Sequence, residues 1–333
     1  MNTLTPAPAG DAVLSASLAR LRKEKNPLVT IGIPTYNGGR AVKRAVASVL
    51  AQSYCNVEIV ISDNASDNET SFICRQLAKA YSCVRYFRQC HNIGMQLNFD
   101  FLLKHAEGKY FMWLADDDVL GNETLIRYVA FLEENPSYSI VSGAIEYLQN
   151  GNILEYERGF NIEHRSPVLR VLHYYFKVIH GAMYHGLMRV ELGQRLALRN
   201  IIGSDWHFVA SLAFLGKMRN LEFTGYHKSL GGSSHNFVAY AKVIGDSEFA
   251  GRYPHFKIAT DAYREVSRRS SAFSALPRYQ RHTLAVLAFV AVLTSYGMKL
   301  YPRIVGGRLK RYCMRVILRR RSSQEYVKPS TNS

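Results

Sequence analysis

The sequence lacks the cysteine patterns that indicate disulfides or a structural metal. Five cysteines, an odd number, occur among 333 residues, and no C-x-x-C pair is present. A disulfide framework or a zinc site is therefore disfavoured, and a reducing compartment such as the cytosol is expected. No basic stretch followed by an apolar core occurs near the N-terminus, so no secretory signal is predicted.

Phosphate-binding loops of the common kinds are missing as well. No G-x-G-x-x-G or Walker A segment occurs, so a dinucleotide or P-loop fold would lack its phosphate-binding loop. A membrane-spanning helix needs roughly 20 apolar residues. The apolar run Leu284 to Leu293 extends to about Leu300 only with polar interruptions, so it predicts a buried or half-inserted helix.

Acidic residues are few relative to basic ones. The 42 Lys and Arg residues against 26 Asp and Glu give a formal net charge of +16, which predicts an anionic partner or surface. Half of this excess lies between Pro302 and Lys328, which holds nine basic residues and one acidic residue. Apolar residues such as Leu309 and Val316 fall on one helical face there, and arginines fall on another. This pattern is typical of a helix at an anionic membrane surface. Nucleic acid is disfavoured because aromatic residues are not interleaved with the charges.

Short apolar strands alternate with amphipathic helices through the first half of the chain. The pattern predicts strands at 28–34, 57–62, 84–88, 110–115 and 138–147, with helices between them. Such alternation predicts an α/β fold with a largely parallel sheet and right-handed crossovers. Further on, Asn150 to Asn152 predicts a hairpin turn, and residues 168–180 predict a helix.

Polar residues follow several of these strands at the point where each strand ends. They are Asn37, Asp63 with Asn64, Asn92, and Asp116 to Asp118. Because the carboxyl ends of parallel strands meet at one edge of a sheet, these residues predict a nucleotide pocket there. Three adjacent carboxylates also suit a hard cation such as Mg²⁺ or Mn²⁺. A lone acidic triplet is more often a solvated turn, and only the surrounding pattern favours a site.

Four segments together resemble a known family. Val29 to Asn37, Ile61 to Asp67, Asn92 to Gly94 and Leu114 to Leu120 resemble the inverting glycosyltransferases of family two. The likeness is dense over residues 28 to 145. The segment Ser62 to Ser66 and the Asn92 to Gly94 loop with Asn98 look like those of bacterial enzymes that build O-antigen, capsule or exopolysaccharide units. It implies the GT-A fold, a Rossmann-like and mostly parallel sheet flanked by helices.

The resemblance and the strand-end positions together predict the site residues. The donor contacts expected are Pro34, Thr35, Tyr36, Asn37, Asp63, Asn64, Asn92, Gly94, Asp116 and Asp117. A DxD-type metal site for Mg²⁺ or Mn²⁺ is implied at Asp117 and Asp118, with His235 as a further ligand or simply a solvated loop residue. The chain departs from the family pattern at Ala115, where members often carry the first aspartate.

Asp205 is the candidate catalytic base. It stands in Ser204-Asp205-Trp206 near the start of a predicted helix, and helix geometry alone favours an N-cap. The family usually has Glu-Asp-Trp or a similar acid pair here, and its aspartate is the base. The resemblance therefore implies this role for Asp205, although Ser204 replaces the first acid.

These observations predict a cytoplasmic enzyme bound peripherally to the inner face of the plasma membrane. It would transfer a sugar from a nucleotide-diphosphate donor to a glycan or polyprenyl-linked acceptor in cell-surface polysaccharide synthesis. The expected regions are a tail at 1–27, a catalytic domain at 28–250 and a basic helical region at 251–333. Within the catalytic domain, residues 28–148 form the nucleotide-sugar half and 149–250 the acceptor half.

Two other functions stay open. A sugar nucleotidyltransferase has a similar fold, but residues 34–39 lack the glycine-rich loop with Arg and Lys that it should carry. A catalytically weak or inactive relative that only binds nucleotide sugar or glycan is also compatible, because acids are absent at Ala115 and Ser204.

Overall fold

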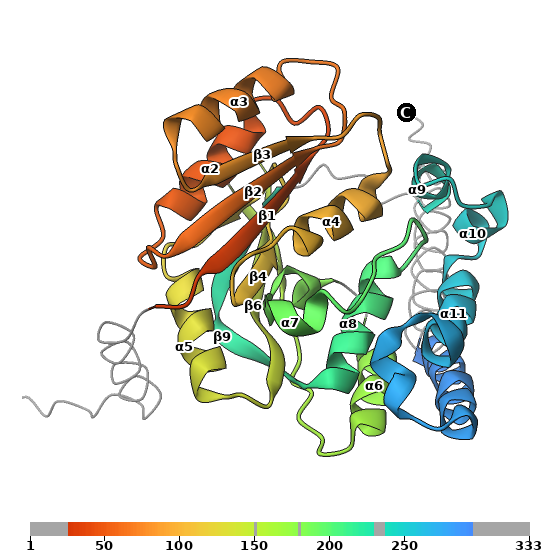
Figure 1. The fold of residues 1–333 in the computed structure, drawn as a ribbon. Helices are drawn as coiled ribbons and strands as arrows, with labels where there is room; N and C mark the ends of the chain where they lie inside the picture. Colours follow the sequence, from red (N-terminus) through yellow and green to blue (C-terminus); the bar gives the residue numbers. More distant parts are fainter. Residues whose placement is uncertain (1–25, 150–151, 179–180, 230–236, 296–333) are drawn as a thin grey trace, which may run out of the picture.

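The computed structural model describes residues 26–149, 152–178, 181–229 and 237–295 (Figure 1). The predicted N-terminal tail, His235 and the basic segment Pro302 to Lys328 lie outside these residues, apart from the last two positions of the tail. In the described chain a mixed sheet of nine strands forms the centre of the molecule, with helices against it.

One half of the sheet is parallel, as the sequence predicts. Its strands lie in the order β3 (Val84–Arg88), β2 (Val57–Asp63), β1 (Val29–Thr35) and β4 (Tyr110–Trp113). The two faces of β4 show why the run is apolar throughout. Tyr110 and Met112 point into one hydrophobic core, and Phe111 and Trp113 point into another. A strand covered on both faces favours apolar side chains at every position.

The other half of the sheet is built from later strands with mixed directions. β8 (Leu187–Arg189) runs antiparallel between β4 and β6 (Tyr138–Gln149), and β6 pairs in parallel with β9 (Lys217–Ser229). The short edge strand β5 (Val119–Leu120) pairs antiparallel with β9. β7 (Asn152–Glu157) returns antiparallel beside β6, which confirms the predicted hairpin.

The helices of the first half fill both faces of the parallel strands. α2 (Ala41–Leu50), α3 (Thr70–Ala80) and α5 (Thr124–Glu134) contribute to the core on one face (Figure 1). α4 (Met95–Lys104) contributes Leu102 and Leu103 to the opposite core. These bounds fall within a few residues of the helices that the apolar spacing predicts.

The helices of the second half share the core of α4. They are α6 (Pro167–Lys177), the 3₁₀ turn η1 (Ala182–His185), α7 (Val190–Gly193), α8 (Ser204–Leu215), α9 (Phe237–Val243), α10 (Glu248–Arg252), α11 (Pro254–Arg264), the π turn η3 (Glu265–Arg269), the 3₁₀ turn η4 (Ser271–Ala275) and a helix over 278–295. Ile258 of α11 and Leu284 of the last helix are buried in that core with Phe208 of α8. Residue 250 therefore does not separate two cores.

The helix over 278–295 is half-buried. Leu284, Ala288 and Val292 pack inward, whereas Val286 and Val290 are exposed. Within the described residues no helix has the length and apolarity needed to cross a bilayer.

Candidate functional site

The acidic turn after β4 is held against the end of β1. Because the two strands are parallel neighbours, Thr35 lies beside Asp116, and its hydroxyl donates to Asp116 Oδ2 at 2.5 Å. A Cβ at Gly38 would lie 2.1 Å from the same oxygen, so a larger residue there would displace the Asp116 carboxylate. Burial raises the pKa of Asp116 to about 6, and the Thr35 hydrogen bond opposes this while the Asp117 charge adds to it.

Asp118 ties the acidic turn to β9. Its side chain is 1% exposed, Oδ2 accepts from the Tyr226 hydroxyl at 2.8 Å, and Oδ1 accepts from the Ser229 backbone N–H at 2.9 Å. The Tyr226 oxygen also accepts from the backbone N–H of Ala115 at 3.2 Å. Burial, followed by the Asp117 charge, raises the pKa of Asp118 to about 7. Tyr226 thus binds the acidic turn at the position where an acid was expected.

Asp117 is the most available of the three carboxylates. It is half-buried, and within the described chain only its backbone carbonyl has an assigned contact, accepting from the Ser229 hydroxyl at 2.7 Å. The described residues contain no convergent group of three acidic, histidine or cysteine side chains. Mg²⁺ commonly uses one or two carboxylates and completes its coordination with water and substrate phosphates. The carboxylate oxygens of Asp116 to Asp118 fit that donor set.

Asp63 is buried at the end of β2. Its Oδ2 accepts from the Tyr86 hydroxyl at 2.9 Å and from the Arg88 guanidinium at 2.8 Å, and Oδ1 accepts from the Ser66 N–H. The side chain is 0% exposed, so direct contact with a nucleotide stays a prediction. Arg88, which pairs with Asp63 across the β2–β3 register, is partly exposed at this end of the sheet.

Asn64, Asn92 and Gly94 form one hydrogen-bonded unit. Asn64 Nδ2 donates to Asn92 Oδ1 at 2.9 Å, and the same oxygen accepts from the Gly94 N–H at 2.9 Å. Gly94 has φ of 90°, and a Cβ there would lie 2.2 Å from Asn200 Nδ2. Asn200 donates to the Ile93 carbonyl at 3.0 Å, which fastens the segment before α8 to this loop.

The loop after β1 presents Tyr36 and Asn37. Pro34 is buried within the strand, whereas Tyr36 is 51% exposed. Asn37 has a positive φ of 57°, its N–H donates to Ser66 Oγ at 2.8 Å, and its Oδ1 accepts from the Asp67 N–H. The loops after β1 and β2 therefore lie together, with an aromatic ring exposed beside them.

Asp205 is the second residue of α8 rather than its N-cap. Gly203, with φ of 78°, occupies the N-cap position, and the cap expected from helix geometry alone is therefore not formed by Asp205. A Cβ at Gly181 would lie 3.5 Å from Asp205 Oδ2, so the carboxylate faces the start of η1. Burial raises the pKa of Asp205, and first-turn N–H groups and the Lys228 charge oppose the rise. Lys228 also lowers the pKa of Asp118, so one ammonium acts on both carboxylates.

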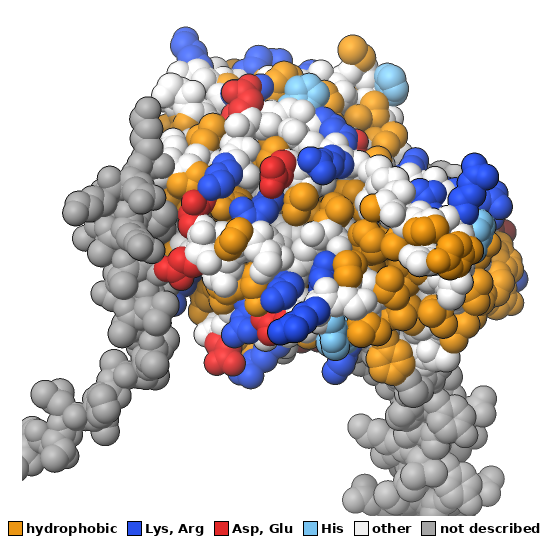
Figure 2. Space-filling view, turned by 60° about the horizontal axis from the view of Figure 1, so that its bottom comes forward, with side chains coloured by type: hydrophobic (Ala, Val, Ile, Leu, Met, Phe, Trp, Pro, Cys, Tyr) orange, Lys and Arg blue, Asp and Glu red, His pale blue; other side chains and the backbone are white. Residues whose placement is uncertain are grey.

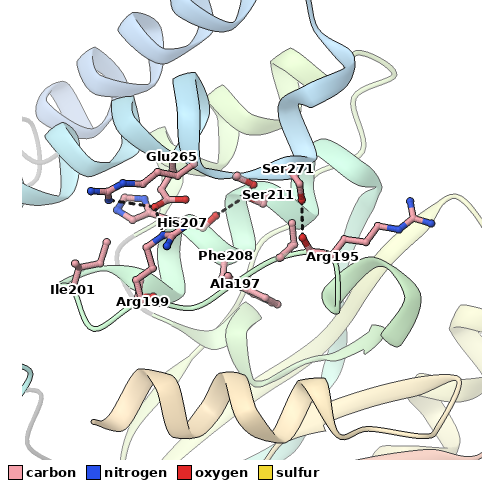
Figure 3. A pocket seen from close by; sticks show the side chains of 13 residues that line it. Arg195, Ala197, Arg199, Ile201, His207, Phe208, Ser211, Glu265 and Ser271 are labelled. Atoms are coloured by element: carbon pink, nitrogen blue, oxygen red, sulfur yellow. Dashed lines mark hydrogen bonds and ion pairs between the residues drawn. The ribbon is translucent and has the colours of Figure 1, made fainter. Parts of the chain in front are cut away.

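A small, partly open pocket of about 100 Å³ lies on another side of α8 (Figure 3). Ser204, His207 and Ser211 line it from one helical face, and Asp205 does not. Across the pocket Glu265 pairs with Arg199 at 3.1 Å. His207 Nδ1 lies 3.1 Å from the Tyr175 hydroxyl, and burial lowers the pKa of His207 to about 4. These contacts are those of a packed polar interior.

Comparison with known proteins follows from this arrangement. Residues 30–193 match the family model described as Glycosyl transferase family 2. The chain carries a family-two glycosyltransferase domain. That span includes the strand-end residues from Thr35 to Asp118 and ends before Asp205.

Bacterial glycosyltransferases resemble parts of this domain. A 145-residue segment is 34% identical to an uncharacterized glycosyltransferase of Rickettsia conorii, covering 40% of this chain and 23% of that protein. The putative glycosyltransferase EpsE of Bacillus subtilis is 32% identical over 116 residues, 34% and 42% of the two chains. The Campylobacter jejuni GalNAc(5)-diNAcBac-PP-undecaprenol beta-1,3-glucosyltransferase is 27% identical over 143 residues, 43% and 46% of the two chains. The matches span less than half the length of each of these relatives.

Solved structures confirm the predicted GT-A fold. S. aureus TarS 1-349 in complex with UDP-GlcNAc superimposes with a TM-score of 0.52 at 17% identity over 79% of this chain and 81% of that one. The mannosyltransferase PcManGT from Pyrobaculum calidifontis, in complex with GDP-Man and Mn²⁺, gives 0.52 at 16% identity over 90% and 89%. At these identities the likeness establishes the fold alone.

Proposed function

We propose that this chain is a metal-dependent, inverting glycosyltransferase that takes its sugar from a nucleotide-diphosphate donor. The observation that carries the proposal is the acidic turn, in which the half-exposed Asp117 lies between Asp116, bound by Thr35, and Asp118, bound by β9. The loops after β1 and β2 lie together at the same edge and offer the exposed Tyr36 to the nucleoside. Membership of a glycosyltransferase family supports transfer over mere binding.

Asp205 acts as the general base in this proposal. Its carboxylate accepts the proton of the acceptor hydroxyl while that oxygen forms a bond to the anomeric carbon. The bond from that carbon to the diphosphate oxygen breaks on the opposite face, and its electron pair leaves with the nucleotide diphosphate. A single displacement of this kind inverts the anomeric centre. The raised pKa of Asp205 suits a proton acceptor better than an ordinary carboxyl would.

Asp117 is the first candidate for holding Mg²⁺ or Mn²⁺, with Asp118 or Asp116 beside it. The bound ion would neutralise charge on the donor diphosphate. Thr35, Tyr226 and Ser229 fix the neighbouring carboxylates, so the turn is ordered before any ligand arrives. The role predicted for His235 lies outside the described residues.

The acceptor in this proposal is a glycan or a polyprenyl-linked sugar used for cell-surface polysaccharide. The printed name of the Campylobacter relative includes an undecaprenol-linked acceptor. Peripheral binding to an anionic membrane is compatible with the exposed apolar side chains of the C-terminal helices. Phe249, Tyr253, Phe256, Val286 and Val290 are each 46% to 53% exposed. Figure 2 shows hydrophobic side chains gathered on the right, where these helices lie in Figure 1.

A panel of nucleotide sugars tests the proposed function. Binding is measured by calorimetry and hydrolysis by release of nucleoside diphosphate, with Mg²⁺, with Mn²⁺ and with excess EDTA. We expect one donor to bind and turn over only with the metal. Full activity in EDTA would remove the metal from the proposal. Tight binding with no turnover on any lipid-linked or glycan acceptor would instead favour the non-catalytic relative.

A further inference from the structure

Lys228 lies opposite the acidic turn because of strand register. In the antiparallel pair of β5 and β9, Val119 faces His227 and Leu120 faces Tyr226. Extending this register by one residue places Lys228 opposite Asp118. The Ser229 N–H, which donates to Asp118 Oδ1 at 2.9 Å, agrees with that placement.

The two groups nearest the Lys228 ammonium are uncharged. Its Nζ lies 3.4 Å from His185 Nε2 and 6.0 Å from the centre of the Tyr147 ring. Among the described residues Lys228 is in no ion pair, whereas Arg88 and Lys109 each have one and Lys257 has two. Asp118 and Asp205 interact with this half-buried ammonium through space rather than in an ion pair, so its N–H groups can still donate to a bound anion.

His185 contacts the Lys228 ammonium through Nε2. The His185 side chain is half-buried and packs on the Tyr226 ring at 4.6 Å between centroids. Burial, then the Lys228 charge, keeps the pKa of His185 well below its usual value, so the ring is neutral. A neutral Nε2 accepts a hydrogen bond from the ammonium and leaves the positive charge on lysine.

We propose that Lys228 binds the diphosphate of the donor and balances the negative charge on the departing nucleotide diphosphate, with His185 as its positioning residue. This inference rests on the proposed function. It gives the diphosphate a second positive partner, a lysine, beside the proposed metal ion. The Lys228 charge lowers the pKa of Asp118, which lies beside the expected diphosphate. It also lowers the pKa of Asp205, the expected base. Charge on the leaving group grows as the sugar bond breaks, so an ammonium aimed at it favours the transition state.

Calorimetry with UDP, GDP and the matching nucleosides tests this role. Lys228→Met should weaken binding of the preferred nucleoside diphosphate by about 10- to 100-fold, which corresponds to one charged hydrogen bond. Affinity for the nucleoside should change by less than about twofold. Lys228→Arg should retain part of the affinity, and kcat should fall further than donor affinity in Lys228→Met. Lys79→Met, which removes an exposed lysine of α3, is the matched control.

A double-mutant cycle with His185→Phe tests the positioning role. The single change should lower diphosphate affinity, and adding it to Lys228→Met should cost little more. Lys228→Gln replaces Lys228→Met if that variant does not fold. Unchanged diphosphate affinity in the Lys228 variants would overturn the inference while leaving the proposed function intact. An equal loss for nucleoside and diphosphate would also overturn it, because the effect would then be structural. A wild-type chain that binds no nucleoside diphosphate would overturn both.

Discussion

The two halves of the molecule build their parts of the site in different ways. In residues 26–149 the site residues follow strand ends or lie in the loops beside them, as with Thr35, Asp63 and Asp116. In the later residues they come from a helix start, a 3₁₀ turn and a strand paired in both directions, as with Asp205, His185 and Lys228. The first arrangement follows from a repeated local rule of parallel sheets. The second depends on which distant segments pair.

Replacing the base in the second half should have the largest effect. Asp205→Asn removes the proposed proton acceptor, and we expect transfer to fall by about 10²- to 10⁴-fold. Donor affinity should stay nearly intact, because Asp205 does not belong to the strand-end cluster. Single-turnover transfer and calorimetry on the same preparation measure the two. Near-normal transfer by the asparagine variant would eliminate Asp205 as base.

The acidic turn offers a contrast within the first half. Asp117→Asn should abolish the stimulation of turnover by Mg²⁺ or Mn²⁺ and leave the melting temperature almost unchanged, since that carboxylate is half-exposed. Asp118→Ala should also abolish turnover and in addition lower the melting temperature, because it leaves Tyr226 and the Ser229 N–H without their acceptor. Equal melting temperatures for the two variants would contradict the distinction.

Removing the basic C-terminal segment tests whether the second half of the chain also binds the membrane. Removing residues 306–333 should lower affinity for anionic vesicles about tenfold or more, because each Lys or Arg near the surface contributes on the order of 1 kcal/mol. Donor binding should survive the truncation. Vesicle sedimentation at low and high salt measures the loss. Undiminished binding by the truncated chain would show that the segment is not an electrostatic anchor.

The pH profile should report on Asp205. A base must be deprotonated, so kcat/KM should fall about tenfold per pH unit below its pKa. Because burial raises that pKa, the decline should begin at a higher pH than for an ordinary aspartate. The residual rate of Asp205→Asn should lack this acid limb. An identical limb in both proteins would assign it to another group.

The smallest effect concerns the contact that joins the halves. Tyr226→Phe removes the donor to buried Asp118, and we expect a loss of about 1–3 kcal/mol in the free energy of unfolding. Urea denaturation measures it, with Tyr81→Phe at an exposed site as the control. A loss no greater than that of the control would mean that the halves are joined by other contacts.

The sequence predicted the strands and helices of the first half because their apolar spacing is local. It also predicted that Asn64, Asn92 and the acidic turn would gather at one edge. It did not reveal Tyr226 or Ser229, whose partner Asp118 lies more than 100 residues away. Nor did it reveal Arg88, although the register of neighbouring strands places it beside Asp63. Asp205 was found by resemblance, while helix geometry alone suggested a cap that Gly203 provides instead.

The Asn200 contact has a consequence for how such an enzyme diversifies. Because Asn200 bonds the Ile93 carbonyl and lies against Gly94, the segment leading to Asp205 is attached to the loop after β3. The position of the proposed base is thereby tied to the loop that holds the proposed donor contacts Asn92 and Gly94. The largely exposed β7 is not part of that attachment. If β7 contacts the acceptor, substitutions there would change acceptor choice without moving the carboxylate proposed as the base, so one scaffold could serve many linkages.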